Sequence, residues 1–386
     1  DEDGFDEERN AFELLKVCNT SHVNMDELKR LVDTGVDLNK QYFSKRITPL
    51  AVLCYRSEID KEALKYLVSK GAKLSAIDFY AQTPLMMACD RKKIDKEALK
   101  LMIELGADVN AVDLEGTPAI MFATNRYEFD KEAVNLLLDY GADVKIAMED
   151  GASLLHNVVS DLELTKKVLE KGADIHATWG GGNVLSSAAY YGTPETVSFF
   201  LEKKMDPNQG DDLGLTPIIY AAKGNKLDVF KILEEAGADI NFRDIHGDGV
   251  MAYACDKRDD YKKNVRAKTP QPDLIKYLID KGFDVNEERE GGFTYLMDTV
   301  ISKDDVTDAV KVLLDAGADI NHKEKDGYTA LMLAQNGKVA SLLIKRGANV
   351  NEKREDEHGA LNFAISQDNY DVVKVLVDNG ADVNSK

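Results

Sequence analysis

The pentapeptide GADIN at residues 237–241 recurs along this 386-residue chain and decides its fold. Its eleven copies, some degenerate, begin 30 to 45 residues apart at Gly35, Gly71, Gly106, Gly141, Gly172, Lys204, Gly237, Gly282, Gly317, Gly347 and Gly380. A period near 33 residues indicates one supersecondary unit stacked many times, because such a unit cannot bury its apolar face alone. The sequence therefore predicts a solenoid and not a closed globule with a central active site.

One copy of the unit, residues 211–237 (DDLGLTPIIYAAKGNKLDVFKILEEAG), shows why each recurring residue type is needed. Thr216 is predicted to cap a short first helix that begins at Pro217, where the missing N–H of proline costs nothing. Asp228 begins a second helix whose apolar residues keep helical spacing. Gly237 ends that helix, because a helix C-terminus needs the left-handed backbone conformation that glycine adopts readily.

This pattern resembles the ankyrin repeat, whose consensus combines a Thr-Pro pair, two short helices and a closing Gly-Ala-Asp-Val-Asn. Thr-Pro pairs occur at residues 48–49, 83–84, 117–118 and 216–217. The resemblance covers nearly the whole chain and implies an all-α solenoid. In that fold, helix-turn-helix units are joined by β-hairpin loops and curve around a concave groove.

We expect residues 1–10 to be an acidic, disordered tail and residues 11–386 to be one solenoid of about eleven repeats, the first and last acting as caps. Three repeats carry extra residues between their helices, as in Ile59-Asp60-Lys61-Glu62. If Asp60 caps the second helix, Ile59 packs on Leu64 as a hydrophobic staple, so the added residues are ordered. A longer insertion at residues 256–272 lacks this pattern.

The net charge of −20, from 49 basic and 69 acidic residues, disfavours nucleic acid as a partner, because such binding needs Lys and Arg to displace counterions. No apolar run approaches the roughly 18 to 20 residues that span a bilayer, so membrane insertion is not expected. We expect a cytoplasmic monomer. Export stays open, because the chain begins at Asp1 without Met.

Catalytic and metal-binding motifs are not found in the sequence, and neither an enzyme activity nor a cofactor nor a metal is expected. The four cysteines all fall in the same position of their repeats, on the first helix: Cys18, Cys54, Cys89 and Cys255. Stacked helices lie about 8 to 10 Å apart, too far for a disulfide. The cysteines are therefore predicted to be small core residues with free thiols.

Aromatic residues at positions that the repeat leaves free are the predicted binding residues, because such side chains dominate protein-binding hot spots. They lie near hairpin tips or at the end of a first helix: Tyr42, Phe43, Phe79, Tyr80, Trp179, Tyr190 and Tyr191. The alternative is that some of them pack between repeats. A second, weaker candidate is the basic insertion with Lys257, Arg258, Lys262, Lys263, Arg266 and Lys268, for which a mobile solvated loop is the favoured alternative.

These observations favour a non-enzymatic scaffold that binds a partner protein, one with a basic surface, through its concave face and hairpin tips. The alternative is a regulatory or targeting ankyrin segment of a larger protein, such as an enzyme, a channel or an exported effector. In that case the activity lies outside this chain.

Overall fold

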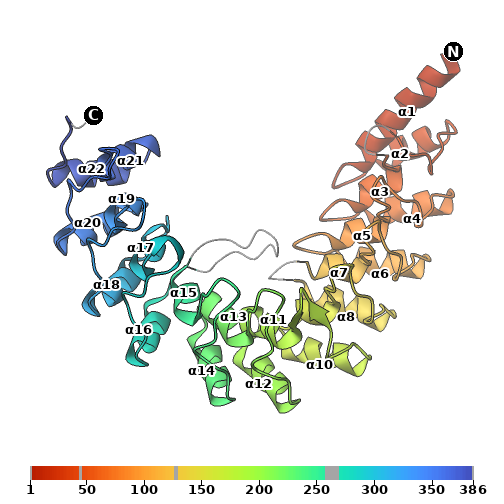
Figure 1. Ribbon diagram of the computed structural model, residues 1–386. Coiled ribbons are helices and arrows are strands. Elements are labelled where there is room, and N and C mark those ends of the chain that lie inside the picture. The colour runs from red at the N-terminus through yellow and green to blue at the C-terminus, as the bar shows by residue number, and fades with distance from the viewer. Residues whose placement is uncertain (1, 43–45, 126–128, 257–268, 385–386) are drawn as a thin grey trace. The chain divides into compact units, whose positions relative to one another are not determined.

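The computed structural model describes residues 2–42, 46–125, 129–256 and 269–384 (Figure 1). It divides into two compact parts, an N-terminal part (Asp1–Gly180) and a C-terminal part (Gly181–Lys386). Each part consists of short helices in consecutive pairs, and each pair is followed by one copy of the pentapeptide. The predicted all-α solenoid is confirmed.

The N-terminal part contains five helix pairs and a two-residue strand among its described residues. Their bounds are α1 (Glu2–Cys18), α2 (Met25–Val32), α3 (Pro49–Cys54), α4 (Lys61–Ser69), α5 (Pro84–Cys89), α6 (Lys96–Glu104), α7 (Ala119–Ala123), α8 (Lys131–Asp139), α9 (Leu154–Asn157), α10 (Leu162–Glu170) and β1 (Thr178–Trp179). The first helices α3, α5, α7 and α9 contact one another in chain order, and α6 contacts α8. The hairpins that precede these first helices therefore follow one another along one edge of the stack.

The C-terminal part repeats this arrangement. Its elements are β2 (Gly182–Asn183), α11 (Val184–Tyr191), α12 (Pro194–Glu202), α13 (Pro217–Lys223), α14 (Leu227–Glu235), α15 (Val250–Cys255), α16 (Pro272–Asp280), η1 (Glu290–Gly292), α17 (Tyr295–Val300), α18 (Thr307–Asp315), α19 (Ala330–Leu333), α20 (Gly337–Lys345), α21 (Ala360–Ser366) and α22 (Tyr370–Asp378). First helices again contact first helices, as in α13 with α15 and α15 with α17.

Helix caps follow the predicted pattern at some helices and not at others: α7 begins after Pro118, and α14 begins at Leu227 after Lys226 and not at Asp228, each without a side-chain cap. The hydroxyl of Thr48 accepts the N–H of Ala51 at 3.2 Å, and Gly237 takes the predicted left-handed conformation with φ of 91°. Thr216 stands at the N-cap position before Pro217, but its hydroxyl makes no capping hydrogen bond. The extended backbone at Thr216 and the proline begin that helix without it.

The extra residues 59–62 and 94–97 make defined hydrogen bonds between two repeats. The carboxylate of Asp95 caps α6 by accepting the N–H of Ala98 at 3.1 Å. Its other oxygen accepts the N–H of Ile59 at 3.1 Å and the ammonium of Lys61 at 2.9 Å, both from the preceding repeat. Ile59 itself is 3% exposed. One aspartate thus caps its own helix and ties two repeats together.

The asparagine that closes the pentapeptide bridges adjacent repeats. Asn110 donates its side-chain N–H to the carbonyl of Gly141 at 3.0 Å and accepts the N–H of Asp143 at 2.8 Å. The same pair of bonds is made by Asn39, Asn208, Asn286, Asn321 and Asn351. Three repeats of the N-terminal part have Ser75, Lys145 and His176 at this position, and none of these side chains carries the amide that the bridge needs.

The two ends of the chain differ from its interior repeats. Helix α1 begins at Glu2, so residues 2–10 are helical and not a disordered tail. Once Ala11 and Leu14 are buried against the second helix, each further residue extends an existing helix at low cost. The last helix pair leaves Ile365 57% exposed, at the position where interior repeats bury a small residue such as Ala222.

Candidate protein-binding surface

The hairpin turn at residues 77–82 is held by its own backbone and by Asp78. The N–H of Asp78 donates to the carbonyl of Gln82 at 3.1 Å. The Asp78 carboxylate accepts the N–H groups of Tyr80 and Gln82, both at 2.9 Å. The fixed turn leaves Phe79 and Tyr80 at its tip, with their rings edge to face and 5.3 Å between centroids.

The next hairpin repeats this turn and is joined to the first. Asp113 accepts the N–H groups of Glu115 and Thr117, both at 2.9 Å. The N–H of Leu114 donates to the carbonyl of Tyr80 at 3.0 Å, a backbone bond from one hairpin tip to the other. The side chains of the two tips are therefore neighbours.

Together these two hairpins expose five large apolar side chains. Their exposed fractions are Ile77 42%, Phe79 55%, Tyr80 61%, Val112 45% and Leu114 70%. We call this set the hairpin-tip patch. Single exposed apolar residues are ordinary, but a contiguous group on a rigid turn is typical of a surface that another molecule covers.

Other repeats place mostly polar residues at the position of Phe79 and Leu114. The equivalent residues are Glu149, Asp212, Ile245, Glu290, Lys325 and Glu355. The fold does not need an apolar residue at this position, since the turn is held by backbone and carboxylate bonds. The apolar tips at Phe79 and Leu114 therefore call for an explanation outside the fold.

The predicted binding residues divide into exposed and buried ones. Phe79 and Tyr80 are exposed, as predicted. The predicted exposure of Tyr42 is wrong, because Tyr42 is 4% exposed and its hydroxyl donates to the carbonyl of Asp37 at 3.0 Å. Burial raises the pKa of Tyr42 to about 12. The residue pairs with Ile47 through the backbone, which turns its ring into the core.

Exposure is also wrong for Tyr190, which is 2% exposed and lies edge to face with Tyr191 at 4.6 Å and with Tyr220 at 6.5 Å. Tyr191 is half-buried. Trp179 is half-buried as well, and its indole N–H donates to Asp150 at 2.9 Å. These aromatics pack within their own part of the chain, which is the alternative that the sequence left open.

Phe43 and the six basic residues of the insertion lie outside the described residues. Ile77, Val112 and Leu114 were not predicted, because the predicted hot-spot residues at hairpin tips were aromatic ones. These residues could have been predicted from one feature of the sequence. An aliphatic residue stands directly beside the turn aspartate, where most repeats have a charged residue.

The buried histidine and cysteine side chains of the described residues are held in their neutral forms. No group of three or more His, Cys, Asp or Glu in the described ranges could hold a metal ion. Burial lowers the pKa of His156 to about 4, and burial raises the pKa of all four cysteine thiols, of Cys18 to about 12. All four cysteines are free and buried, as predicted. A buried neutral thiol is a poor nucleophile.

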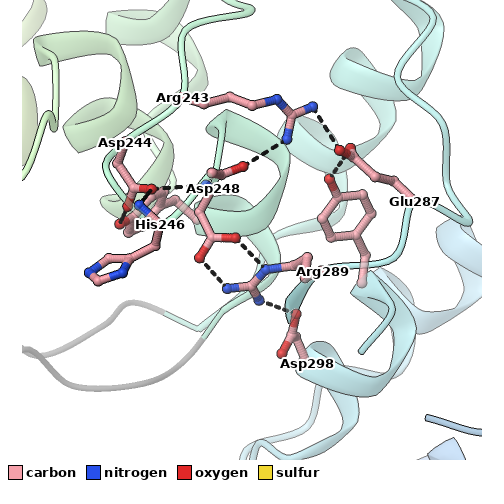
Figure 2. A network of polar contacts seen from close by, with 10 residues as sticks. Arg243, Asp244, His246, Asp248, Glu287, Arg289 and Asp298 are labelled. Carbon is pink, nitrogen blue, oxygen red and sulfur yellow. Dashed lines mark hydrogen bonds and ion pairs between the residues drawn. The ribbon is translucent and has the colours of Figure 1, made fainter. Parts of the chain in front are cut away.

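A buried polar network in the C-terminal part, shown in Figure 2, is structural in character. Arg289 binds Asp248 through two parallel contacts of 2.7 and 2.5 Å and also donates to Asp298. In the preceding repeat, Asp244 occupies the turn position of Arg289 and accepts the hydroxyl of Tyr253 at 2.6 Å. Asp298 and Tyr253 each lie nine residues beyond the turn residue that they contact. The arginine–aspartate pair of one repeat therefore stands where the preceding repeat has an aspartate–tyrosine pair.

Comparison with known proteins agrees with this architecture. The family model for ankyrin repeats (3 copies) matches residues 14–113, 158–244 and 298–386, which is more than half of the chain. The chain therefore belongs to the ankyrin repeat family. Ankyrin repeats are generally protein–protein interaction modules, and within the described ranges no helix is both long and apolar enough to cross a membrane.

A curated relative is also similar over a short stretch. The ankyrin repeat-containing protein P1E11.10 of Schizosaccharomyces pombe is 39% identical over 70 residues. The aligned stretch is 18% of this chain and 33% of that protein.

Proposed function

We propose that this chain is a non-enzymatic scaffold that binds a partner protein through the hairpin-tip patch. The observation that carries the proposal is the joined pair of hairpin tips, whose apolar side chains are up to 70% exposed. Burying apolar surface contributes roughly 25 cal/mol per Å², so aromatic and leucine side chains at such tips can supply much of a binding energy.

The turn geometry supports this role as well. Tyr80 and Leu114 are held by hydrogen bonds from their own turns and from each other, so little backbone freedom is lost on binding. Binding by a rigid surface costs less conformational entropy than binding by a flexible one. The net charge of −20 adds a long-range field that favours a partner with a basic surface.

The test is a comparison of what two variants of the immobilised chain capture from a cell extract. The patch variant is F79S/Y80S/L114S. The control variant is I365S/Y370S/V383S, which removes three side chains of similar exposure, 57%, 78% and 63%, from the C-terminal part. We expect proteins that are captured by the unmodified chain and the control to be lost from the patch variant. Equal capture by all three would reject the patch as the binding site.

A further inference from the structure

The charges on either side of the hairpin-tip patch are arranged in order along the stack. The hairpin before the patch carries Arg46, which is exposed and has its guanidinium 5.7 Å from the centre of the Phe79 ring. The hairpin after the patch carries Glu149, which is exposed at the same turn position as Leu114. Arg46, the Phe79 and Leu114 tips and Glu149 thus give the order cation, apolar, apolar, anion among the described residues of four successive hairpins.

This order has a definite centre. The four hairpins precede α3, α5, α7 and α9, which stack in that sequence. Neighbouring helices lie about 8 to 10 Å apart, so the first and fourth hairpins lie about 24 to 30 Å apart, with the contact between Tyr80 and Leu114 near the middle. Neither charged side chain has an ion pair with any residue that the structure describes. Arg46 is exposed beside the Phe79 ring and Glu149 is exposed, so both charges can reach another molecule.

A row of side chains with this order of charges is complementary to the same row on a second copy after a rotation of 180°. A two-fold axis through the midpoint brings Arg46 of each copy opposite Glu149 of the other and the Phe79 hairpin opposite Leu114. Isologous contacts about a two-fold axis are the commonest form of protein self-association.

We propose that the hairpin-tip patch binds a second copy of this chain, in an antiparallel homodimer with two equivalent contacts between Arg46 and Glu149. This deepens the proposed function by naming the partner at the same patch, and it replaces the expectation of a monomer. Glu115 of each copy then faces the Phe79–Tyr80 hairpin of the other, where the Tyr80 hydroxyl can donate to it.

The dimer is weak by this reasoning. The patch has five apolar residues, and an interface of that size falls in the class of transient complexes. The net charge of −20 per chain opposes association, although physiological salt screens charges beyond about 8 Å. We expect a dissociation constant of about 10 μM to 1 mM.

Sedimentation velocity of the purified full chain over a concentration series tests the proposal through charge reversal. Because each substitution alters both equivalent contacts, R46E and E149K alone should each weaken the dimer roughly tenfold. In a mixed dimer of R46E with E149K, the introduced glutamate faces the introduced lysine, and the second contact keeps the original arginine and glutamate. The mixture should therefore recover dimerisation that neither variant shows alone.

Control variants K65E and E170K make the same charge changes at exposed residues of α4 and α10 and should leave the dimer unchanged. The proposal is overturned by a chain that stays monomeric at every concentration, by a dimer that R46E leaves unchanged, by a mixture that does not recover, or by open-ended oligomers. Such results leave the capture experiment unaffected, because a different partner could still require the patch. A chain that forms no dimer, together with equal capture by the unmodified chain and the patch variant, would reject the patch itself.

Discussion

Replacing Arg289 is expected to lower the free energy of unfolding more than replacing a member of an exposed ion pair does. Its side chain is 10% exposed, and its partners Asp248 and Asp298 are 18% and 6% exposed. Arg289→Met keeps the aliphatic volume but removes the cation that neutralises two largely buried carboxylates. Removing one member of a buried pair typically costs about 3–5 kcal/mol, so a loss of this size is expected.

The preceding repeat suggests how to recover the loss. There, Asp244 at the turn binds Tyr253 nine residues later. Arg289→Asp alone adds a third carboxylate and should be at least as damaging as Arg289→Met. The double variant R289D/D298Y recreates the aspartate–tyrosine pair and should recover roughly half of the loss, a coupling that only neighbouring residues show.

Urea unfolding followed by circular dichroism measures the total effect, and hydrogen exchange of α15 and α17 measures it locally, because repeat arrays need not unfold in one step. Arg346→Met serves as control, since its pair with Asp315 is 40% and 64% exposed and should contribute at most about 1 kcal/mol. The reasoning fails if Arg289→Met costs no more than the control, or if R289D/D298Y is no more stable than R289D.

Three further predictions concern the junctions and the core. Burial alone would raise the pKa of Asp95, but hydrogen bonds from Lys61 and two backbone N–H groups lower this pKa on balance. The stabilisation that the Asp95 carboxylate gives is therefore fully present above its unfolded pKa of about 3.9. This stabilisation is lost as the pH falls through the lower folded pKa. Asp95→Asn should accordingly destabilise the chain by about 1 kcal/mol at neutral pH and by clearly less at pH near 3, and a pH-independent difference in urea midpoint would contradict this. Lys145→Asn supplies the missing amide bridge to the next repeat and should raise the free energy of unfolding by about 1 kcal/mol. The control is Lys65→Asn on the outer surface, which should not raise the urea midpoint. A thiol reagent should label none of the four buried cysteines until urea unfolds the chain, and rapid labelling in buffer would show that their repeats open locally.

The parts of the fold that could be predicted from sequence are those fixed by local chemistry. Gly237 marks a helix end because its conformation is needed there, and the shared position of the cysteines follows from counting along one helix. The role of Asp60 and Asp95 as caps could be predicted for the same reason. Each of these needs only residues within one repeat.

Side-chain direction could not be predicted in this way. Tyr42 and Tyr80 both lie near hairpin tips, but the first turns inward because it pairs with Ile47, and the second stays exposed because Asp78 fixes its turn. The role of Arg289 was also missed. Its partner lies nine residues away and would emerge only from aligning its hairpin with the one before it.

The absence of an amide at Ser75 has a mechanical consequence for the patch. Ser75 directly precedes the first of the two patch hairpins, so these hairpins are joined at their tips by Leu114 and Tyr80 without the asparagine bridge at their base. In the C-terminal part, by contrast, Asn286, Asn321 and Asn351 bridge three junctions in succession. We therefore expect the base of this junction to open more easily than the bridged junctions of the C-terminal part, while the turns that carry Tyr80 and Leu114 stay fixed by their own hydrogen bonds.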